Sequence, residues 1–520
     1  MSRPEKQRIA VSTALYSLAT GLSRFLGLAR EILVAGLFGT VGASINAFTV
    51  ANQVPNLIRS LVADAALGAA FVPVFNGLLE RGERERAWRV ASSVWWLSFI
   101  GLTIVTALSM LAAPQILGIF GYQGSLGVGL ARVIFPTVVV LGLSGLATAI
   151  LNTFDEFFLP AIAPVAWNIV IVAILALTVP FVHSTSGRLY AYAIGILLGT
   201  VVQFAIPLPA LRRHGTIAWA LDYDDPAVRR VFALMIPVTL GLGLINLNML
   251  IDTYFATTVN GDVGPRSIEA AFRIYMLPQG MFSVAVAAVL FPALARHVAN
   301  RNGRAFRGAT AQGIRQIVFL LLPSSAVSAV FALPITRLLF EHGTFSSDQT
   351  PLVAYCVAAF AGGLTFNGVI LLLNRAFFSL QLAWLPTFVA LANLALNALL
   401  DWIFAREFGI WGIPLATSLV NVFSTILLYR LLRARVGAID EYRTLRAITR
   451  IAVATAIAMA LAYPVWYGLD RELGRFVPLQ ALSLGAGLAV AVLTFALVAR
   501  ATRIEEYDDV VRLLRRRRST

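Results

Sequence analysis

The chain has 520 residues, of which 58% are hydrophobic and 13% are charged, and its formal net charge is +15. This composition is far more apolar than that of soluble proteins of similar length, so it excludes a soluble globular fold. A single cysteine, Cys356, excludes an intramolecular disulfide within the sequence. The composition is typical of a polytopic membrane protein.

Apolar windows long enough to cross a hydrocarbon core as helices, about 17–25 residues each, recur along the chain. No strand-like alternation competes with them. We predict an all-α polytopic membrane protein with about fourteen transmembrane helices, at 9–38, 43–79, 90–113, 131–153, 160–182, 189–211, 228–258, 268–296, 312–336, 351–376, 384–405, 411–432, 448–467 and 478–499. The second span is too long for one straight crossing, which predicts a broken or bent helix that lines a cavity.

Basic residues are distributed unevenly between the two sides of the predicted bundle. If the N-terminus is cytoplasmic, the termini and the even-numbered connections hold 30 of the 41 Lys and Arg, and the opposite side holds seven. This asymmetry follows the positive-inside rule and places both termini in the cytoplasm. The basic charge therefore reflects topology and does not indicate nucleic acid binding, and the basic tail 501–520 is expected on anionic lipid headgroups.

The sequence also repeats itself with a period of about 220 residues. The stretch 70–89 resembles 289–307, and three ordered landmarks align: Pro55 with Pro278, Pro73 with Pro292 and Asn152 with Asn374. Six crossings return the chain to the same side, so the two halves are predicted to be parallel repeats related by an axis along the membrane normal. The predicted domains are an N-lobe at 1–225, a C-lobe at 226–440, two extra helices at 441–500 and a cytoplasmic tail at 501–520.

Four arginines fall inside predicted spans, at Arg24, Arg30, Arg59 and Arg273. A charge at mid-bilayer costs at least ~2.5–3.5 kcal/mol, so it normally faces a cavity or a partner and marks a functional site. Few acids accompany these arginines, and the planar guanidinium suits phosphate oxygens. The sequence thus predicts a positively charged cavity that binds a phosphate-bearing substrate.

An alternative remains open for Arg30. It could pair with Glu31 or Asp64 and so tie the first two helices together. Arg24 and Arg30 lie about 240° apart on a regular helix, so they share one cavity only if the helix bends. The glycines of this helix allow such a bend. The substrate interpretation is favoured for Arg24, Arg59 and Arg273.

A second pattern lies in the later helices. Asn397 and Asp401 stand at i and i+4, on one helix face, and Asp252 lies in the seventh predicted span. Two carboxylates, an amide oxygen and a hydroxyl such as that of Thr417 are hard oxygen ligands suited to a small hard cation. A polar packing contact with waters explains the spacing equally well. The four histidines show no ligand spacing of the zinc type.

Several motifs resemble the MurJ/MviN family of lipid II flippases. They are SRFLGLARE at 23–31, NAFTVANQVPNLIR at 46–59, AALGAAFVPVF at 65–75 and AFRIYMLPQG at 271–280. The arrangement of six helices, six helices and two more is similar to the fold of that family, within the multidrug/oligosaccharidyl-lipid/polysaccharide exporter superfamily. The resemblance covers essentially the whole chain.

The resemblance implies a transporter of the bacterial inner membrane that moves lipid II, the undecaprenyl-pyrophosphate-linked peptidoglycan precursor, to the outer leaflet. It implies that the substrate-binding arginines are Arg24, Arg30, Arg59 and Arg273, supported by acids at Glu31 and Asp64. Some members of that family have a sodium site, for a coupling or structural ion, whose ligands match Asp252, Asn397, Asp401, the Ile413 carbonyl and Thr417; the resemblance implies no other cofactor. The last two helices would form a groove for the lipid tail. Lipid II and membrane lipids are the partners implied, and other cell-wall synthesis proteins stay open.

Two positions depart from the family pattern. An acid commonly found at the start of the second helix is Asn46 here, and a basic residue often found before the Pro-Asn pair is Gln53. The first departure puts a salt bridge of that acid in doubt, and the second removes one positive charge from the cavity. Three other functions remain to be tested: export of another polyprenyl-linked saccharide, multidrug or cation antiport, and enzymatic action on a lipid-linked sugar.

Overall fold

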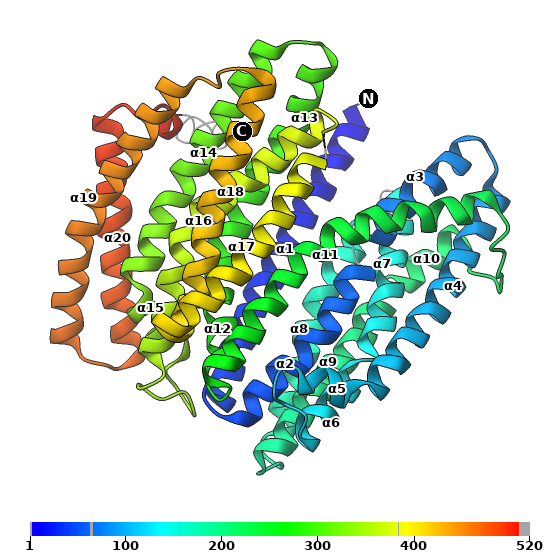
Figure 1. Ribbon diagram of the computed structural model, residues 1–520, viewed down its shortest axis with the longest axis horizontal. Coiled ribbons are helices and arrows are strands. Elements are labelled where there is room, and N and C mark those ends of the chain that lie inside the picture. Colours follow the sequence, from blue (N-terminus) through cyan, green and yellow to red (C-terminus); the bar gives the residue numbers. More distant parts are fainter. Residues whose placement is uncertain (1–2, 63–65, 155, 383, 509–520) are drawn as a thin grey trace. The chain divides into compact units, whose positions relative to one another are not determined.

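The computed structural model describes residues 3–62, 66–154, 156–382 and 384–508. Over these residues the chain forms helices and no strand. The chain divides into two compact units, Met1–Arg266 and Ser267–Thr520, and each is described by itself below. Figure 1 follows the chain from the N-terminal helices in blue to the C-terminal pair in orange and red.

The first unit contains eleven helices and the start of a twelfth, counted over its described residues. They are α1 (Arg3–Phe38), α2 (Ala43–Val62), α3 (Ala66–Glu80), α4 (Arg84–Leu111), α5 (Ala113–Gly118), α6 (Ser125–Ile134), α7 (Thr137–Thr153), α8 (Phe158–Thr178), α9 (Thr185–Ala205), α10 (Leu208–His214), α11 (Pro226–Asn260) and α12 (Gly264–Pro278). Helix α1 packs along α8, α8 packs along α9, and α11 packs on α2 and α3. One apolar core lies among α1, α2, α6, α8 and α9, and another lies among α3, α4 and α7.

The second unit follows Arg266. Its elements are the π-helix η1 (Gln279–Ser283), α13 (Val284–Ala299), α14 (Gly303–Val330), α15 (Ala332–Phe340), α16 (Thr350–Ser379), α17 (Trp384–Phe408), the 3-10 turn η2 (Gly409–Trp411), α18 (Gly412–Val436), α19 (Glu441–Leu473) and α20 (Val477–Ala501). Helix α16 packs against α14 and α18. Helices α19 and α20 run side by side, and α19 lies along α14 (Figure 1).

The fold confirms the prediction of an all-α membrane protein, because every predicted span falls on one or more helices. Over the residues that the structure describes, nine helical segments are long and apolar enough to cross a membrane. The span predicted at 268–296 consists of α12, η1 and α13, and the π-turn begins directly after Pro278. Single π-turns inside helices occur frequently at functional sites.

The division between the units falls later than the predicted lobe boundary at 225/226. Helix α11 packs on α2 and α3 and is therefore grouped with the first unit. The division by packing does not bear on the repeat in the sequence, so the repeat and the predicted domains stay predictions. The tail beyond 508 lies outside the described residues.

Candidate functional site

Helix α1 carries the first two predicted arginines and packs on α8. The Arg24 side chain is half-buried, whereas that of Arg30 is only 4% exposed. Asn168 of α8 joins the two helices beside Arg24, because its Nδ2 donates to the carbonyl of Ser23 on α1 at 3.4 Å; within α8 it also donates to the carbonyl of Pro164 at 2.9 Å. Arg24 and Arg30 thus both lie on the helix that packs along α8.

Arg30 lies against an aromatic ring. Its guanidinium carbon is 4.6 Å from the ring centroid of Trp167, at cation–π distance. Within the described part of the chain Arg30 forms no ion pair, and its buried Nε has no hydrogen-bond partner. Asp64, one of the two acids considered for it, lies outside the described residues. Its sequence neighbour Glu31 is engaged elsewhere.

Glu31 forms an ion pair with Arg266, and both side chains are buried, at 1% and 3% exposed. Arg266 stands at the start of α12 and is one of the seven basic residues counted on the side opposite the termini. The pair therefore links α1 to the α11–α12 junction, within the first unit. The alternative in which Glu31 pairs with Arg30 is therefore not observed: Glu31 pairs with Arg266.

Asn46 explains the first departure from the family pattern. Its side chain is fully buried, its Nδ2 lies within hydrogen-bond distance of the carbonyls of Thr40, Gly42 and Asp262, and its Oδ1 accepts from the Arg266 backbone N–H at 2.8 Å. A carboxylate accepts but cannot donate. The amide therefore suits this position, and its oxygen holds the backbone of Arg266, the residue that pairs with Glu31.

The second departure, Gln53, also joins helices of the first unit. The Thr253 hydroxyl on α11 donates to the Gln53 side-chain oxygen on α2 and to the carbonyl of Met249. Nearby, the Tyr122 hydroxyl donates to the carbonyl of Gly261. The C-terminal half of α11 is therefore fastened to α2 and to the loop before α6.

The remaining predicted arginines are placed as follows. Arg59 lies in α2, and its side chain is outside the described part of the structure. Arg273 belongs to the second unit, on α12, where its exposed guanidinium pairs with Glu269 one turn earlier at 3.2 Å. The structure thus brings Arg24 and Arg30 onto one helix with Glu31, and it describes Arg273 separately.

The predicted cation ligands of the second unit lie on α17 and α18, which pack together. Asn397 and Asp401 are both fully buried, and Asn397 Nδ2 donates to Asp401 Oδ2 at 2.7 Å. The Thr417 hydroxyl faces the Ile413 carbonyl at 3.4 Å. The donor set consists of hard oxygens and fits a small hard cation. The fifth predicted ligand, Asp252, is a buried residue of α11 in the first unit.

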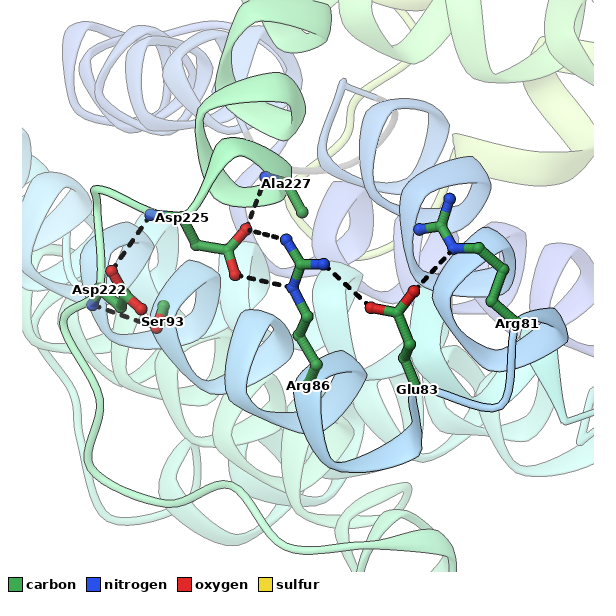
Figure 2. A network of polar contacts seen from close by, with 7 residues as sticks. All are labelled: Arg81, Glu83, Arg86, Ser93, Asp222, Asp225 and Ala227. Carbon is green, nitrogen blue, oxygen red and sulfur yellow. Dashed lines mark hydrogen bonds and ion pairs between the residues drawn. The ribbon is translucent and has the colours of Figure 1, made fainter.

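A polar network that the sequence reasoning missed crosses the end of α4 (Figure 2). Arg86 donates to both carboxylate oxygens of Asp225, at 3.1 and 3.2 Å, and to Glu83 at 2.9 Å. Asp225 also caps α11 by accepting from the Ala227 N–H. The hydrogen bonds from Arg86 hold the pKa of the Asp225 carboxyl below its usual value. The Ser93 hydroxyl accepts from the Asp222 N–H, which adds a contact between α4 and the segment before α11 to this network.

A second set of ion pairs anchors α19 and α20. The buried Arg337 of α15 pairs with Asp470 and donates to Gln480 at 3.0 Å. At the other end of these helices the buried Arg315 of α14 donates to Glu506 at 2.8 Å. Phe331, Trp466 and Leu484 form a buried apolar cluster between the two anchors. This C-terminal pair is thus attached to α14 and α15 by polar contacts at both ends, around an apolar centre.

Comparisons with known proteins identify relatives of this chain among lipid II flippases. The family model described as lipid II flippase MurJ matches residues 34–485. A probable lipid II flippase MurJ of Rhizobium meliloti is 31% identical over 92% of this chain and 91% of its own length. One from Vibrio cholerae is 29% identical over 87% and 88%. The lipid II flippase MurJ of Burkholderia cenocepacia is 28% identical over 91% and 93%.

Solved structures agree on the fold. A lipid II flippase MurJ in an inward closed conformation superposes with a TM-score of 0.78 at 23% identity, covering 94% of this chain and 99% of that one. An inward-facing multidrug resistance MATE family transporter of the MOP superfamily gives a TM-score of 0.69 at 18% identity, over 81% and 96%. The extent of the family match, together with the relative at 31% identity, decides the assignment: the chain belongs to the MurJ family of lipid II flippases.

Proposed function

We propose that this chain flips lipid II from the inner to the outer leaflet of the cytoplasmic membrane by alternating access. It is a transporter and carries out no bond-breaking step. The observation that carries the proposal is Arg30, a buried guanidinium that rests on an aromatic ring and has no carboxylate partner among the described residues. A buried cation of this kind suits a pyrophosphate, which accepts two parallel hydrogen bonds from one guanidinium.

The pyrophosphate contacts are assigned to the intramembrane arginines, Arg24, Arg30, Arg59 and Arg273. Binding the headgroup in the protein while the undecaprenyl tail stays in lipid avoids moving the charged group through hydrocarbon, where each charge costs at least ~2.5–3.5 kcal/mol. Glu31 is assigned as the supporting acid of this site, and Asp64 as a second one. The tail is assigned to the apolar surface of α19 and α20, where Leu461, Leu493 and Leu497 are exposed.

A sodium ion is proposed at Asn397, Asp401, the Ile413 carbonyl and Thr417, with Asp252 as the fifth ligand. When bound, the ion would supply positive charge that balances the carboxylates. The chain's own contribution is to hold these oxygens on α17 and α18, where Gly409 (φ +70°) turns the chain between the two helices. Glycine adopts this left-handed backbone without strain.

The orientation proposed for the chain has both termini in the cytoplasm, as the distribution of arginines indicates. This puts the Arg86–Asp225 network on the cytoplasmic side and the Glu31–Arg266 pair toward the outer side. The multidrug antiport alternative is disfavoured, because a site for cationic drugs should present acids to its substrate, whereas Arg30 presents a cation.

The proposal is tested by rescue of bacteria depleted of their own lipid II flippase. Arg30→Ala and Arg24→Ala should abolish rescue while the protein level in the membrane stays unchanged. Arg446→Ala is the matched control, because Arg446 is exposed on the N-terminal part of α19, and it should rescue fully. Full rescue by both Arg24→Ala and Arg30→Ala would overturn the assignment of the substrate site.

A further inference from the structure

We propose that Trp167 and Arg266 are positioning residues that keep Arg30 available as an anion-binding cation. Arg266 engages the acid next to Arg30, and Trp167 supports the guanidinium without neutralising it. The inference rests on the proposed function, because it assigns to these residues the preparation of the pyrophosphate site. Both residues lie in the first unit, together with Arg30.

The first step concerns the acid beside Arg30. Glu31 is 1% exposed, so its carboxylate needs a cationic partner or several hydrogen bonds to remain charged. Without such a partner, the negative charge of Glu31 would offset the positive charge of Arg30, its neighbour in the sequence. Arg266 reaches it across 235 residues of sequence, and its backbone N–H is fixed by the Asn46 amide at 2.8 Å. Glu31 and Arg266 together carry no net charge, so among the described residues no carboxylate compensates the positive charge of Arg30.

The second step concerns how a buried guanidinium is held without a counter-ion. The face of an aromatic ring attracts a cation through its quadrupole and leaves the N–H edge of the guanidinium unoccupied. Arg30 lies over Trp167 in this way, at 4.6 Å, and its buried Nε has no hydrogen-bond partner among the described residues. The Trp167 indole N–H also has none there. What Trp167 supplies is therefore its ring face, not its hydrogen bond.

The third step concerns how Trp167 is itself fixed. Its neighbour Asn168 donates to the Ser23 carbonyl on α1, which sets the register between α8 and α1. Behind the indole stands Gly199 of α9, where a Cβ would lie 2.9 Å from Trp167 Cδ1 and 3.0 Å from the Trp167 carbonyl oxygen. Only glycine leaves that space. One turn earlier, a Cβ at Gly195 would make ordinary contacts of 3.6 Å with α8.

The charge arrangement is tested by a double substitution. Full-length protein in detergent is titrated calorimetrically with inorganic pyrophosphate. Arg266→Gln leaves the charge of Glu31 to offset that of Arg30 and should weaken pyrophosphate binding about tenfold, which corresponds to ~1.4 kcal/mol. Glu31→Gln/Arg266→Gln removes both charges of the pair and should restore binding to within about threefold of the unsubstituted protein. A double variant that binds as poorly as Arg266→Gln alone would overturn the role of Arg266.

The aromatic support is tested by matched pairs of variants. Trp167→Phe keeps a ring face and should retain pyrophosphate affinity, whereas Trp167→Leu should lose about tenfold. Gly199→Ala should weaken binding by displacing the indole, and Gly195→Ala on the same helix should not. Equal affinities for the Phe and Leu variants, with Gly199→Ala unchanged, would refute the role of Trp167.

The same variants separate this inference from the proposed function. Lipid II transport is measured in vesicles that contain each protein. If the unsubstituted protein binds pyrophosphate but moves no lipid II, the proposed function fails while the binding series still judges the positioning roles. If it moves lipid II and the binding series shows no effect of Arg266 or Trp167, only the positioning roles fail. A protein that binds no inorganic pyrophosphate at all would also contradict them.

Discussion

Replacing Asn46 by aspartate introduces the acid that the family resemblance leads us to expect at this position, and we expect it to destabilise the first unit. The Asn46 Nδ2 lies 2.8 Å from the Asp262 carbonyl, 3.0 Å from that of Gly42 and 3.3 Å from that of Thr40. A carboxylate oxygen in its place would face three carbonyl oxygens and donate to none of them. A carboxylate at this position could still accept the hydrogen bond from the Arg266 backbone N–H.

The magnitude follows from the two hydrogens of the amide. Each buried hydrogen bond that is lost with its partner left behind costs about 1–3 kcal/mol. Asn46 is fully buried, so solvent does not replace its hydrogen bonds. Allowing for relaxation, we expect a loss of about 2–4 kcal/mol, which corresponds to a fall in Tm of roughly 5–10 °C for a unit of this size.

The assay is thermal loss of helical circular dichroism in detergent. The control is Asn260→Asp, which makes the same chemical change at an exposed residue whose side-chain oxygen accepts a hydrogen bond from the Asp262 N–H. That variant should melt within about 1 °C of the unsubstituted protein, because surface substitutions change stability little. Equal melting of the Asn46→Asp and Asn260→Asp proteins would refute the role assigned to the Asn46 amide.

Two further predictions concern the ion pairs outside the arginine site. Hydrogen bonds from Arg86 lower the pKa of Asp225, so the ionised carboxylate stabilises the fold above the ordinary carboxyl pKa of about 4, and this stabilisation is lost as the pH falls through the lower folded pKa. Asp225→Asn should therefore flatten the fall in stability at acid pH. An unchanged fall, or an equal effect of Asp224→Asn at a largely exposed site, would contradict this. Asp470→Asn leaves the buried Arg337 of α15 without its carboxylate partner and should destabilise the second unit. The single cysteine, Cys356, is fully buried in that unit, so a thiol-reactive dye should label it at a temperature several degrees lower than in the unsubstituted protein. Labelling at the same temperature would contradict the role assigned to the Arg337–Asp470 pair.

The helices could be predicted from the sequence because hydropathy is a local property. Each predicted span meets a helix, and the span around Pro278 contains the proline that directly precedes its π-turn. The turn itself was not predicted, because proline can also kink a helix or end it. Which of these occurs depends on the packing of the flanking helices, which a single sequence does not encode in readable form.

The arginine site could be predicted in part. An arginine within an apolar run identifies itself, so Arg24 and Arg30 stand out. Arg266 does not, because it lies close to the end of a span and resembles any other basic loop residue. Its pairing with Glu31 joins positions 235 residues apart, and nothing in the local sequence of either residue indicates the other. Asn46 looked like the loss of a charge, whereas its role comes from backbone carbonyls that carry no sequence signature.

The most direct test of the central claim measures lipid II at the outer leaflet. Vesicles are prepared with lipid II and the purified full-length protein, and a membrane-impermeant reagent that modifies the headgroup is added outside. If the chain flips lipid II, the modified fraction should rise beyond the share initially exposed and approach completion, and vesicles with Arg30→Ala protein should behave like protein-free vesicles. Equal modification with and without the unsubstituted protein would contradict the account.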